Sequence, residues 1–239
     1  MDLDALPDQV SRAVKHFWAS RAGQATSHAS GEASERGQRG AVLGGKQLDG
    51  FAELIEAQLR HSGVPQSSIF AAKRTELPGY FRATKKWDIV VVHDGMLLSA
   101  IELKSQVGSF GNNLNNRTEE SLGNSTDINT AFREGAFGGS PAPWLGYLML
   151  VEDAPKSTSP VKVNEPHFST FPCFPESSYL DRYGILMTRL IRERLYSGAT
   201  LLTSRQEDAI SGSYREPNDE VSAERFVRSM CGHVEAYIA

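Results

Sequence analysis

The sequence has few of the features that mark membrane, secreted or zinc-binding proteins. Its 239 residues include only two cysteines, Cys173 and Cys231, which are too few for a multi-bridge disulfide framework and have no CxxC partner to bind zinc. The longest apolar run, at 145–151, is far shorter than the roughly 18 residues that a membrane helix needs. The first residues are acidic, whereas a signal peptide begins with basic ones. We therefore expect a cytoplasmic protein without a membrane partner.

A net positive charge, which many nucleic-acid-binding proteins carry, is also absent. The chain has 25 Lys and Arg against 29 Asp and Glu, for a formal net charge of −4. The basic residues are nevertheless concentrated in three segments, which are 12–46, 73–86 and 182–205. Such segments can form a basic face on an acidic protein, and ordinary solvated surface charge is the alternative. The charge pattern therefore permits nucleic-acid binding without requiring it.

The spacing of apolar residues predicts several helices around a few short strands. Phe51, Leu54, Ile55 and Leu59, for example, recur every three or four residues, as on one face of a helix. The predicted helices cover 6–19, 48–62, 126–136, 178–196 and 219–236, the predicted strands cover 87–92, 97–104 and 144–151, and a long loop is expected over 22–45. This order predicts an α/β (α+β) fold with a mixed central sheet, in one domain over 1–239 whose core spans about 48–151.

One predicted hairpin carries an unusual set of charged side chains. Asp94-Gly95 is a tight-turn pair between its two strands. Period-two alternation in the second strand places Glu102 and Lys104 on one face, with apolar residues on the other. Antiparallel pairing across this turn joins positions whose numbers sum to 189 or 190, so that Asp88 lies opposite Ile101 or Glu102. Two carboxylates this close, within apolar strands, call for a divalent cation.

Two carboxylates beside a lysine suit the metal-assisted hydrolysis of a phosphodiester. Carboxylate oxygens can hold Mg²⁺, which polarises the scissile phosphate and lowers the pKa of a bound water. Lys104 can orient that water and offset the charge that builds on the phosphate. The alternative is an exposed Glu–Lys pair on an edge strand, with Asp88 as a capping residue. Glu-x-Lys alone is common, but its combination with Asp88, a hairpin turn and an apolar strand favours a nuclease.

The segment after this strand is rich in amide side chains. Asn can read adenine, and Arg can read guanine, through paired hydrogen bonds in the major groove. The alternative is a turn-rich loop in which Asn and Gly only satisfy the backbone. Because the segment directly follows the carboxylate-bearing strand, we expect a loop that reads DNA. The expected DNA-binding residues of this segment are Ser105, Gln106, Asn112, Asn113, Asn115, Asn116 and Arg117.

Two further groups of residues are candidates for contacts to the DNA backbone. Lys46 and Gln47 directly precede a predicted helix, where a lysine and backbone N–H groups can meet a phosphate. Several basic residues also lie just before the predicted hairpin, although a solvated surface explains them equally well. These basic residues are Lys73, Arg74, Arg82, Lys85 and Lys86, of which Lys85 and Lys86 are the preferred candidates.

Asp88 together with Glu102-Leu-Lys104 resembles the signature of the PD-(D/E)xK nuclease superfamily. Trp87 stands where the motif has proline, but that proline is often missing in the superfamily. Three longer strings resemble XhoI-type type II restriction endonucleases: Gly44-Gly-Lys-Gln-Leu-Asp-Gly50, Ile101-Glu-Leu-Lys-Ser-Gln106 and Phe110-Gly-Asn-Asn-Leu-Asn-Asn-Arg-Thr-Glu-Glu120. Their order and the chain length match, so the resemblance covers most of the chain. It implies a restriction-endonuclease-like core, in which helices flank a mixed central sheet.

The resemblance also implies an activity and its partners. It implies a homodimer that cuts both strands of duplex DNA at a palindrome with Mg²⁺, at the sequence CTCGAG after the first C. A cognate DNA methyltransferase would act on the same site. By motif match, the metal ligands would be Asp88, Glu102 and the carbonyl of Leu103, and Lys104 would serve the water. A glutamate from the helix before the sheet often joins such sites, and Glu53 is preferred here over Glu56.

Two other functions fit the same residues less well. A superfamily nuclease of DNA repair would cleave branched or single-stranded DNA without preferring a palindrome. A DNA-binding module without chemistry would keep the fold but would be free to lose Asp88, Glu102 and Lys104. All three residues are present, which favours an enzyme.

Overall fold

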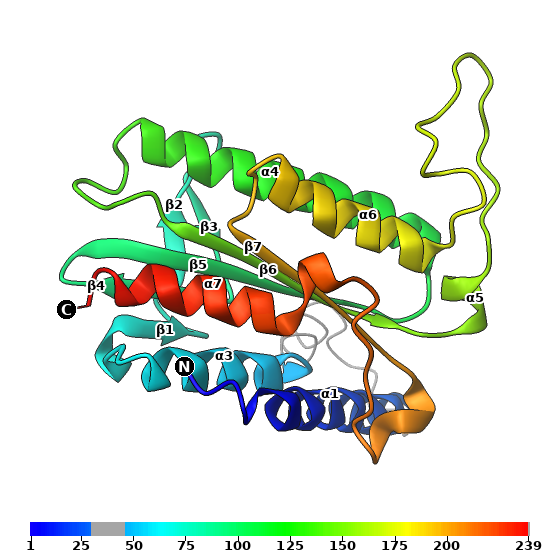
Figure 1. Ribbon diagram of the computed structural model, residues 1–239, viewed down its shortest axis with the longest axis horizontal. Helices are drawn as coiled ribbons and strands as arrows, with labels where there is room; N and C mark the ends of the chain where they lie inside the picture. Colours follow the sequence, from blue (N-terminus) through cyan, green and yellow to red (C-terminus); the bar gives the residue numbers. More distant parts are fainter. Residues whose placement is uncertain (30–45, 239) are drawn as a thin grey trace.

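Two layers of helices enclose a five-stranded sheet in the computed structural model, which describes residues 1–29 and 46–238 (Figure 1). The outer strand β1 pairs antiparallel with β4, and β4 with β5, whereas β5, β6 and β7 run parallel to one another. This mixed sheet confirms the predicted fold class. In spatial order, the strands are β1 (Ile69–Ala71), β4 (Ile89–His93), β5 (Met96–Gln106), β6 (Trp144–Glu152) and β7 (Gly198–Ser204).

The helices bury a separate apolar core on each face of the sheet. One face is covered by α4 (Phe110–Arg133) and α6 (Tyr179–Arg192), and the other by α1 (Leu6–Ala29), α3 (Asp49–His61) and α7 (Ala223–Glu235) (Figure 1). Within the described ranges, no helix is both long and apolar enough to cross a membrane.

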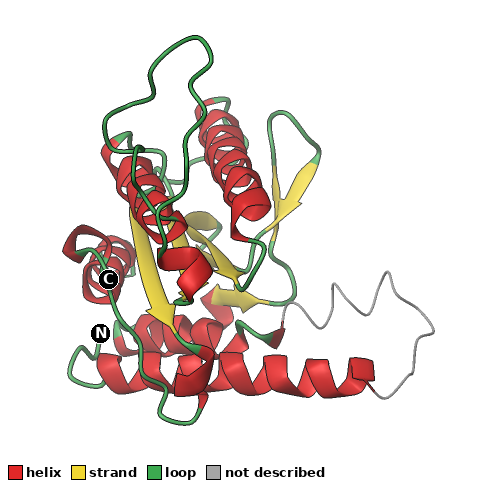
Figure 2. Ribbon diagram, turned by 90° about the vertical axis from the view of Figure 1, so that its right-hand side faces the viewer, coloured by secondary structure: helices red, strands yellow, loops and turns green. Residues whose placement is uncertain are grey.

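A two-stranded ribbon projects from the main sheet beside α4 (Figure 2). It pairs β2 (Glu76–Pro78) with β3 (Thr84–Lys86), and β3 leads directly into β4. The remaining elements are short: α5 (Pro155–Thr158) and the 3₁₀ turns Gln66–Ser68, Gln206–Ala209 and Asp219–Val221.

The β4–β5 hairpin has the turn and the register that the sequence predicts. Asp94 and Gly95 both have positive φ, at 48° and 78°, which matches the twist of a tight hairpin. Val90 pairs with Ala100 and Val92 with Leu97, so the paired numbers sum to 190 and then, beyond a bulge, to 189. Asp88 continues this register opposite Glu102, and the prediction that the two carboxylates are neighbours is confirmed.

Two paired glycines make room for a tryptophan across the parallel strands. Gly146 of β6 pairs with Gly198 of β7, and the ring of Trp144 lies over both. A Cβ added to either glycine would collide with that ring. Trp144 also packs edge-to-face on Phe226 of α7 and donates a hydrogen bond from Nε1 to Ser229 Oγ at 2.9 Å. The glycine pair therefore lets α7 dock on the sheet.

Three of the predicted segments have wrong boundaries, and the strands β1, β2, β3 and β7 were not predicted. The first helix continues through the start of the predicted loop to Ala29, and the rest of that loop (30–45) lies outside the described residues. The segment predicted as a DNA-reading loop is the start of α4, whose second half is the helix predicted over 126–136. The helix predicted over 178–196 ends at Arg192, and strand β7 follows it. The strands β1, β2 and β3, at three residues each, are too short for the alternation rule to reveal.

We predict that Gly198→Ala destabilises the protein by about 1–3 kcal/mol, because the added methyl group collides with the Trp144 ring in a packed core. Urea unfolding measures the effect. The matched control is Gly232→Ala in α7, where a Cβ meets no atom within 4 Å and the better helix propensity of alanine makes the change neutral or stabilising by up to about 1 kcal/mol. Equal stability of the two variants would contradict this role of the glycine pair.

Candidate active site

The two carboxylates meet across the β4–β5 hairpin. The Asp88 N–H donates to the Ile101 carbonyl at 3.1 Å, and the Leu103 N–H donates to Asp88 Oδ2 at 2.7 Å. The backbone of β5 therefore holds Asp88 in place from both sides of Glu102. Glu102 itself is only 4% exposed, whereas Asp88 is exposed to solvent. The site thus combines a buried carboxylate, Glu102, with a solvent-accessible one, Asp88.

Two lysines hold the buried carboxylate. Lys104 Nζ contacts Glu102 Oε1 from the same strand face, as the alternation predicts. Lys85 Nζ, from β3, lies 2.7 Å from Glu102 Oε2 and 4.5 Å from the centre of the Trp87 ring. The side chain of Lys85 is only 11% exposed. Each oxygen of Glu102 therefore has its own ammonium partner, which is what an ionised carboxylate needs away from water.

The electrostatic balance at Asp88 favours a cation. Its pKa is raised, mainly because the surrounding protein removes part of its hydration and next because the Glu102 charge repels its own. The solvent that reaches its outer side limits this effect. The Leu103 N–H and the two lysines act in the opposite direction. A cation bound between the carboxylates would relieve the repulsion and favour the ionised form of Asp88.

A buried polar group lies behind Glu102 on the next strand. Tyr147 pairs with Glu102 in the β5–β6 register and is fully buried. Burial and the Glu102 charge raise the pKa of Tyr147, so that its hydroxyl stays protonated. Among the described residues, neither this hydroxyl nor that of Tyr183 nor Nε of Arg117 has a hydrogen-bond partner. Such buried polar groups are normally satisfied by ordered water.

The amide-rich segment forms the first turns of α4 instead of a loop. Asn112, Asn115 and Asn116 are exposed and share one helix face, while Asn113 donates a hydrogen bond to the Ser109 carbonyl at 3.1 Å. Arg117 pairs with Glu120 at 2.6 Å and interacts electrostatically with the two buried tyrosines. The helix thus presents three asparagines to solvent and one arginine toward the sheet.

Comparison with known proteins gives a consistent result. The family model described as Restriction endonuclease XhoI matches residues 27–216. The Type II restriction enzyme BstVI of Geobacillus stearothermophilus is 52% identical over 206 residues, which cover 84% of this chain and 92% of the relative. The Type II restriction enzyme XhoI of Xanthomonas vasicola is 44% identical over 188 residues, which cover 77% of this chain and 75% of the relative. No solved structure matches.

The chain belongs to the XhoI restriction endonuclease family. It is therefore a DNA-cleaving hydrolase of the type II restriction class, and the resemblance stated from the sequence is confirmed. A shorter match, at 52% identity over 125 residues, is to the Type II restriction enzyme AbrI of Azospirillum brasilense. The five-stranded mixed sheet between helices is the restriction-endonuclease-like core of this family member.

The other predicted DNA-contacting residues of this XhoI family member occupy different environments. Lys46 and Lys86 are exposed, and Ser105 is half-buried. Gln47 is buried and accepts a hydrogen bond from Arg21 at 3.3 Å. Gln106 is also buried and donates to the Gly108 carbonyl, which fixes the passage from β5 into α4.

The predicted third carboxylate does not lie with the other two. Glu53 is exposed on α3 and lines a hollow between α1 and α3, next to Arg12 and His16. Glu56 lies 3.7 Å from Arg60 on the same helix. In the described part of the chain, no three Asp, Glu, His or Cys side chains form a group that could hold a metal. The correction has a simple cause, because helical spacing alone does not tell which side of α3 faces the hairpin.

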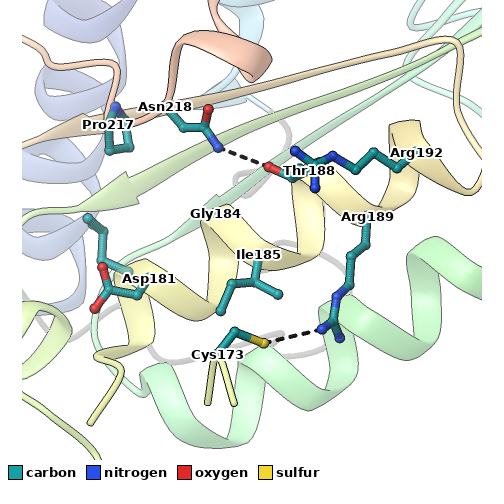
Figure 3. Close-up of a pocket in the computed structure, with 10 residues that line it drawn as sticks. Cys173, Asp181, Gly184, Ile185, Thr188, Arg189, Arg192, Pro217 and Asn218 are labelled. Carbon is teal, nitrogen blue, oxygen red and sulfur yellow. Dashed lines mark hydrogen bonds between the residues drawn. The ribbon is translucent and has the colours of Figure 1, made fainter. Parts of the chain in front are cut away.

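A separate pocket of about 410 Å³ lies on the outer side of α6 (Figure 3). Arg189 Nη2 approaches Cys173 Sγ at 3.2 Å on one side of it, and Asn218 donates to Thr188 Oγ1 at 2.9 Å on the other. Neither Asp88 nor Glu102 lines this pocket. The candidate active site is therefore not the hollow in Figure 3 but the start of β4 at Asp88.

The sequence interpretation missed the role of Lys85 inside the site. Lys85 was expected on the DNA backbone, but the β2–β3 register directs it onto Glu102 while its neighbour Lys86 points to solvent opposite Glu76. No local sequence signal distinguishes the two lysines, since only the pairing of β3 with β2 decides which one faces the hairpin. Tyr147 was likewise treated only as part of an apolar strand.

We predict that Lys85→Met lowers the free energy of unfolding by about 1–3 kcal/mol, because Glu102 would lose one of its two partners while remaining buried. Chemical denaturation of the full chain at neutral pH measures this. Lys86→Met, one residue along the same strand but exposed, should change stability by less than about 0.5 kcal/mol. If Lys86→Met proved as damaging as Lys85→Met, the Lys85–Glu102 pair would not be what stabilises the site.

Proposed function

We propose that this protein is a metal-dependent homodimeric endonuclease that cleaves both strands of duplex DNA at the palindrome CTCGAG, after the first C. The observation that carries the metal-dependent chemistry is the Asp88–Glu102 pair across the β4–β5 hairpin, with Lys104 on the same strand face. The proposed sequence rests on the resemblance of residues 110–120 to XhoI-type enzymes.

The donor set at the hairpin fits Mg²⁺. Asp88 and Glu102 offer hard carboxylate oxygens, and the carbonyl of Leu103 follows Glu102 directly on the same strand. Mg²⁺ binds through one or two carboxylates plus water and substrate phosphate, so a third protein carboxylate is not required. When bound there, the ion would polarise the scissile phosphate and acidify a water molecule.

The side chains of the site divide the remaining work. Lys104 Nζ lies beside Glu102, where it can donate a hydrogen bond to the attacking water or to the phosphate. Lys85 supplies a second positive charge on the other Glu102 oxygen, which lowers the repulsion that an incoming phosphate meets. Asp88 is the solvent-exposed carboxylate of the pair, so an incoming DNA phosphate meets it before it meets Glu102.

Sequence reading is assigned to the first turns of α4. Asn112, Asn115 and Asn116 present amide groups from one exposed face, and amides pair well with adenine in the major groove. An α-helix also fits the width of that groove. Arg117 requires a change of partner to reach a base, because it is engaged with Glu120. Lys46, Gln47, Lys86, Ser105, Gln106 and Asn113 remain proposed supporting contacts.

The partners follow from the symmetry of a palindrome. Two identical half-sites are read by two copies of one chain around a twofold axis, which calls for a homodimer. The host's own copies of the site require a cognate DNA methyltransferase that modifies them in the same compartment, the cytoplasm. No stable complex with that enzyme is needed, since both act on the DNA.

We predict that the purified protein cuts a sequenced plasmid into discrete fragments in the presence of Mg²⁺. Mapping the fragment ends tests the site, and every end should fall after the first C of CTCGAG. EDTA should abolish the cleavage. A smear of products would contradict sequence specificity. Discrete ends at another sequence would show that the recognition site is not CTCGAG. Full activity in EDTA would contradict metal dependence.

We predict that Glu102→Ala and Lys104→Ala each lower the single-turnover cleavage rate by at least about 10²–10³-fold, because the first removes a proposed metal ligand and the second removes the positive charge beside the reacting phosphate. The exposed Lys162, far along the chain from the hairpin, provides the control Lys162→Ala, which should cleave like the unmodified protein. Circular dichroism should show that all three variants are folded. If Lys104→Ala cleaved DNA at the normal rate, Lys104 would have no role in the cleavage reaction.

A further inference from the structure

The tip of the β2–β3 ribbon displays two aromatic side chains to solvent. Tyr80 is 53% exposed and Phe81 is 70% exposed. Their rings pack edge-to-face, with centroids 5.0 Å apart and an interplanar angle of 84°. Below them, Leu77 is buried and anchors the ribbon in the core under α4. The two rings therefore project beyond a ribbon whose base is fixed.

A buried carboxylate locks the tip to α4. Asp127 Oδ1 accepts hydrogen bonds from the backbone N–H groups of Tyr80 and Phe81, both at 2.8 Å. Its Oδ2 accepts from Arg82 Nε at 2.6 Å, and Arg82 also donates to Asn124 Oδ1 at 2.8 Å. Burial alone would raise the pKa of Asp127, but these donors hold it below its ordinary value. An ionised Asp127 thus fixes both aromatic residues by their backbones.

Gly79, the residue before the tip, must lack a side chain for Asp127 to make these hydrogen bonds. A Cβ at Gly79 would lie 2.6 Å from Asp127 Oδ2 and 2.8 Å from the Arg82 carbonyl oxygen. The lock does not bury the aromatic rings, since both stay exposed. Its structural effect is to hold two apolar rings rigidly in water, an arrangement that favours binding to a preorganised surface.

The tip lies close to the candidate active site along the chain. Phe81 and Asp88 are seven positions apart, and an extended chain of that length spans at most about 23 Å. At 3.4 Å per base pair, this distance corresponds to about six or seven base pairs of duplex. A duplex bound at Asp88 can therefore meet the tip within about seven base pairs of the cleaved phosphate.

The charge around the ribbon matches a nucleic acid. Lys73 and Arg74 before it and Lys86 within it are exposed, and Lys85 sits in the active site itself. Exposed aromatics framed by basic residues are typical of proteins that stack on bases or wedge between them. Among protein partners, only an acidic one would be attracted by these basic residues.

We propose, building on the duplex DNA cleavage proposed above, that Tyr80 and Phe81 form an aromatic wedge that packs against a base step of the bound duplex within about seven base pairs of the cleaved phosphate. Asp127 and Gly79 are positioning residues for this wedge. The wedge supplies apolar contact rather than charge, so its contribution to binding does not depend on counterion release.

The test measures binding of a fluorescent 30-base-pair duplex containing CTCGAG by the full chain in the Lys104→Ala background, in which we expect cleavage to be slowed at least about 100-fold. Phe81→Ala should weaken binding about 10- to 100-fold, and Tyr80→Ala should weaken it by a similar or smaller factor. The slope of log Kd against log salt should stay unchanged, because no phosphate contact is lost. Phe168→Ala, at a residue that is 89% exposed in another loop, is the matched aromatic control and should bind normally.

Two further measurements distinguish base stacking by the wedge from an effect on protein assembly. A 2-aminopurine placed in turn at each step within about seven base pairs of the cleaved phosphate should, at one of these steps, brighten with the parent protein but not with Phe81→Ala. Asp127→Ala, which keeps both rings but frees the tip, should also reduce the brightening. Sedimentation velocity of the free proteins should show the same assembly state for the parent and Phe81→Ala.

The outcomes are distinct. If the parent binds the duplex and Phe81→Ala binds equally well, the wedge is overturned while the nuclease function stands. If Phe81→Ala instead changes the assembly state, the tip is a contact between copies of this chain and the wedge is again overturned. If the parent binds no duplex DNA of any sequence, both the wedge and the nuclease function fail.

Discussion

The repulsion between two neighbouring carboxylates is the constraint on which the site depends. Asp88 and Glu102 face each other across a hairpin, and Glu102 is buried. A buried charge of this kind persists only with close partners of opposite sign. Lys104 comes from the same strand and Lys85 from the projecting ribbon. The ribbon, the hairpin and the strand behind them therefore have to assemble together for the site to form.

Helix α4 links this site to the surfaces that can meet DNA. Strand β5 passes into it through a short bend that Gln106 holds by a hydrogen bond to Gly108. The first turns expose the asparagines, and the second half carries Asp127, which fixes the ribbon tip. One helix thus positions the proposed reading face and the aromatic tip relative to the same pair of carboxylates. A rigid element of this kind keeps chemistry and recognition in register.

Local rules predicted some features and failed for others. The Asp94-Gly95 turn and the period of two were enough to pair Asp88 with Glu102, because a hairpin register is set by its turn. The amide-rich segment was predicted as a loop because Asn and Gly are poor helix formers. Packing overrides that preference, since Phe110 and Ile128 of α4 are buried against the sheet and α6. The small and apolar residues spaced three or four apart over 110–131 were the signal for this helix.

The sequence by itself determined the family, the mixed sheet and the placement of Asp88, Glu102 and Lys104 around one hairpin, because each depends on short motifs, strand period or one tight turn. Tertiary structure alone decided that Lys85, and not Lys86, joins Glu102, since that choice depends on how β3 pairs with β2. It also decided that Glu53 faces α1 instead of the hairpin. Contacts between distant segments carry no fixed spacing along the chain, so only the folded arrangement reveals them.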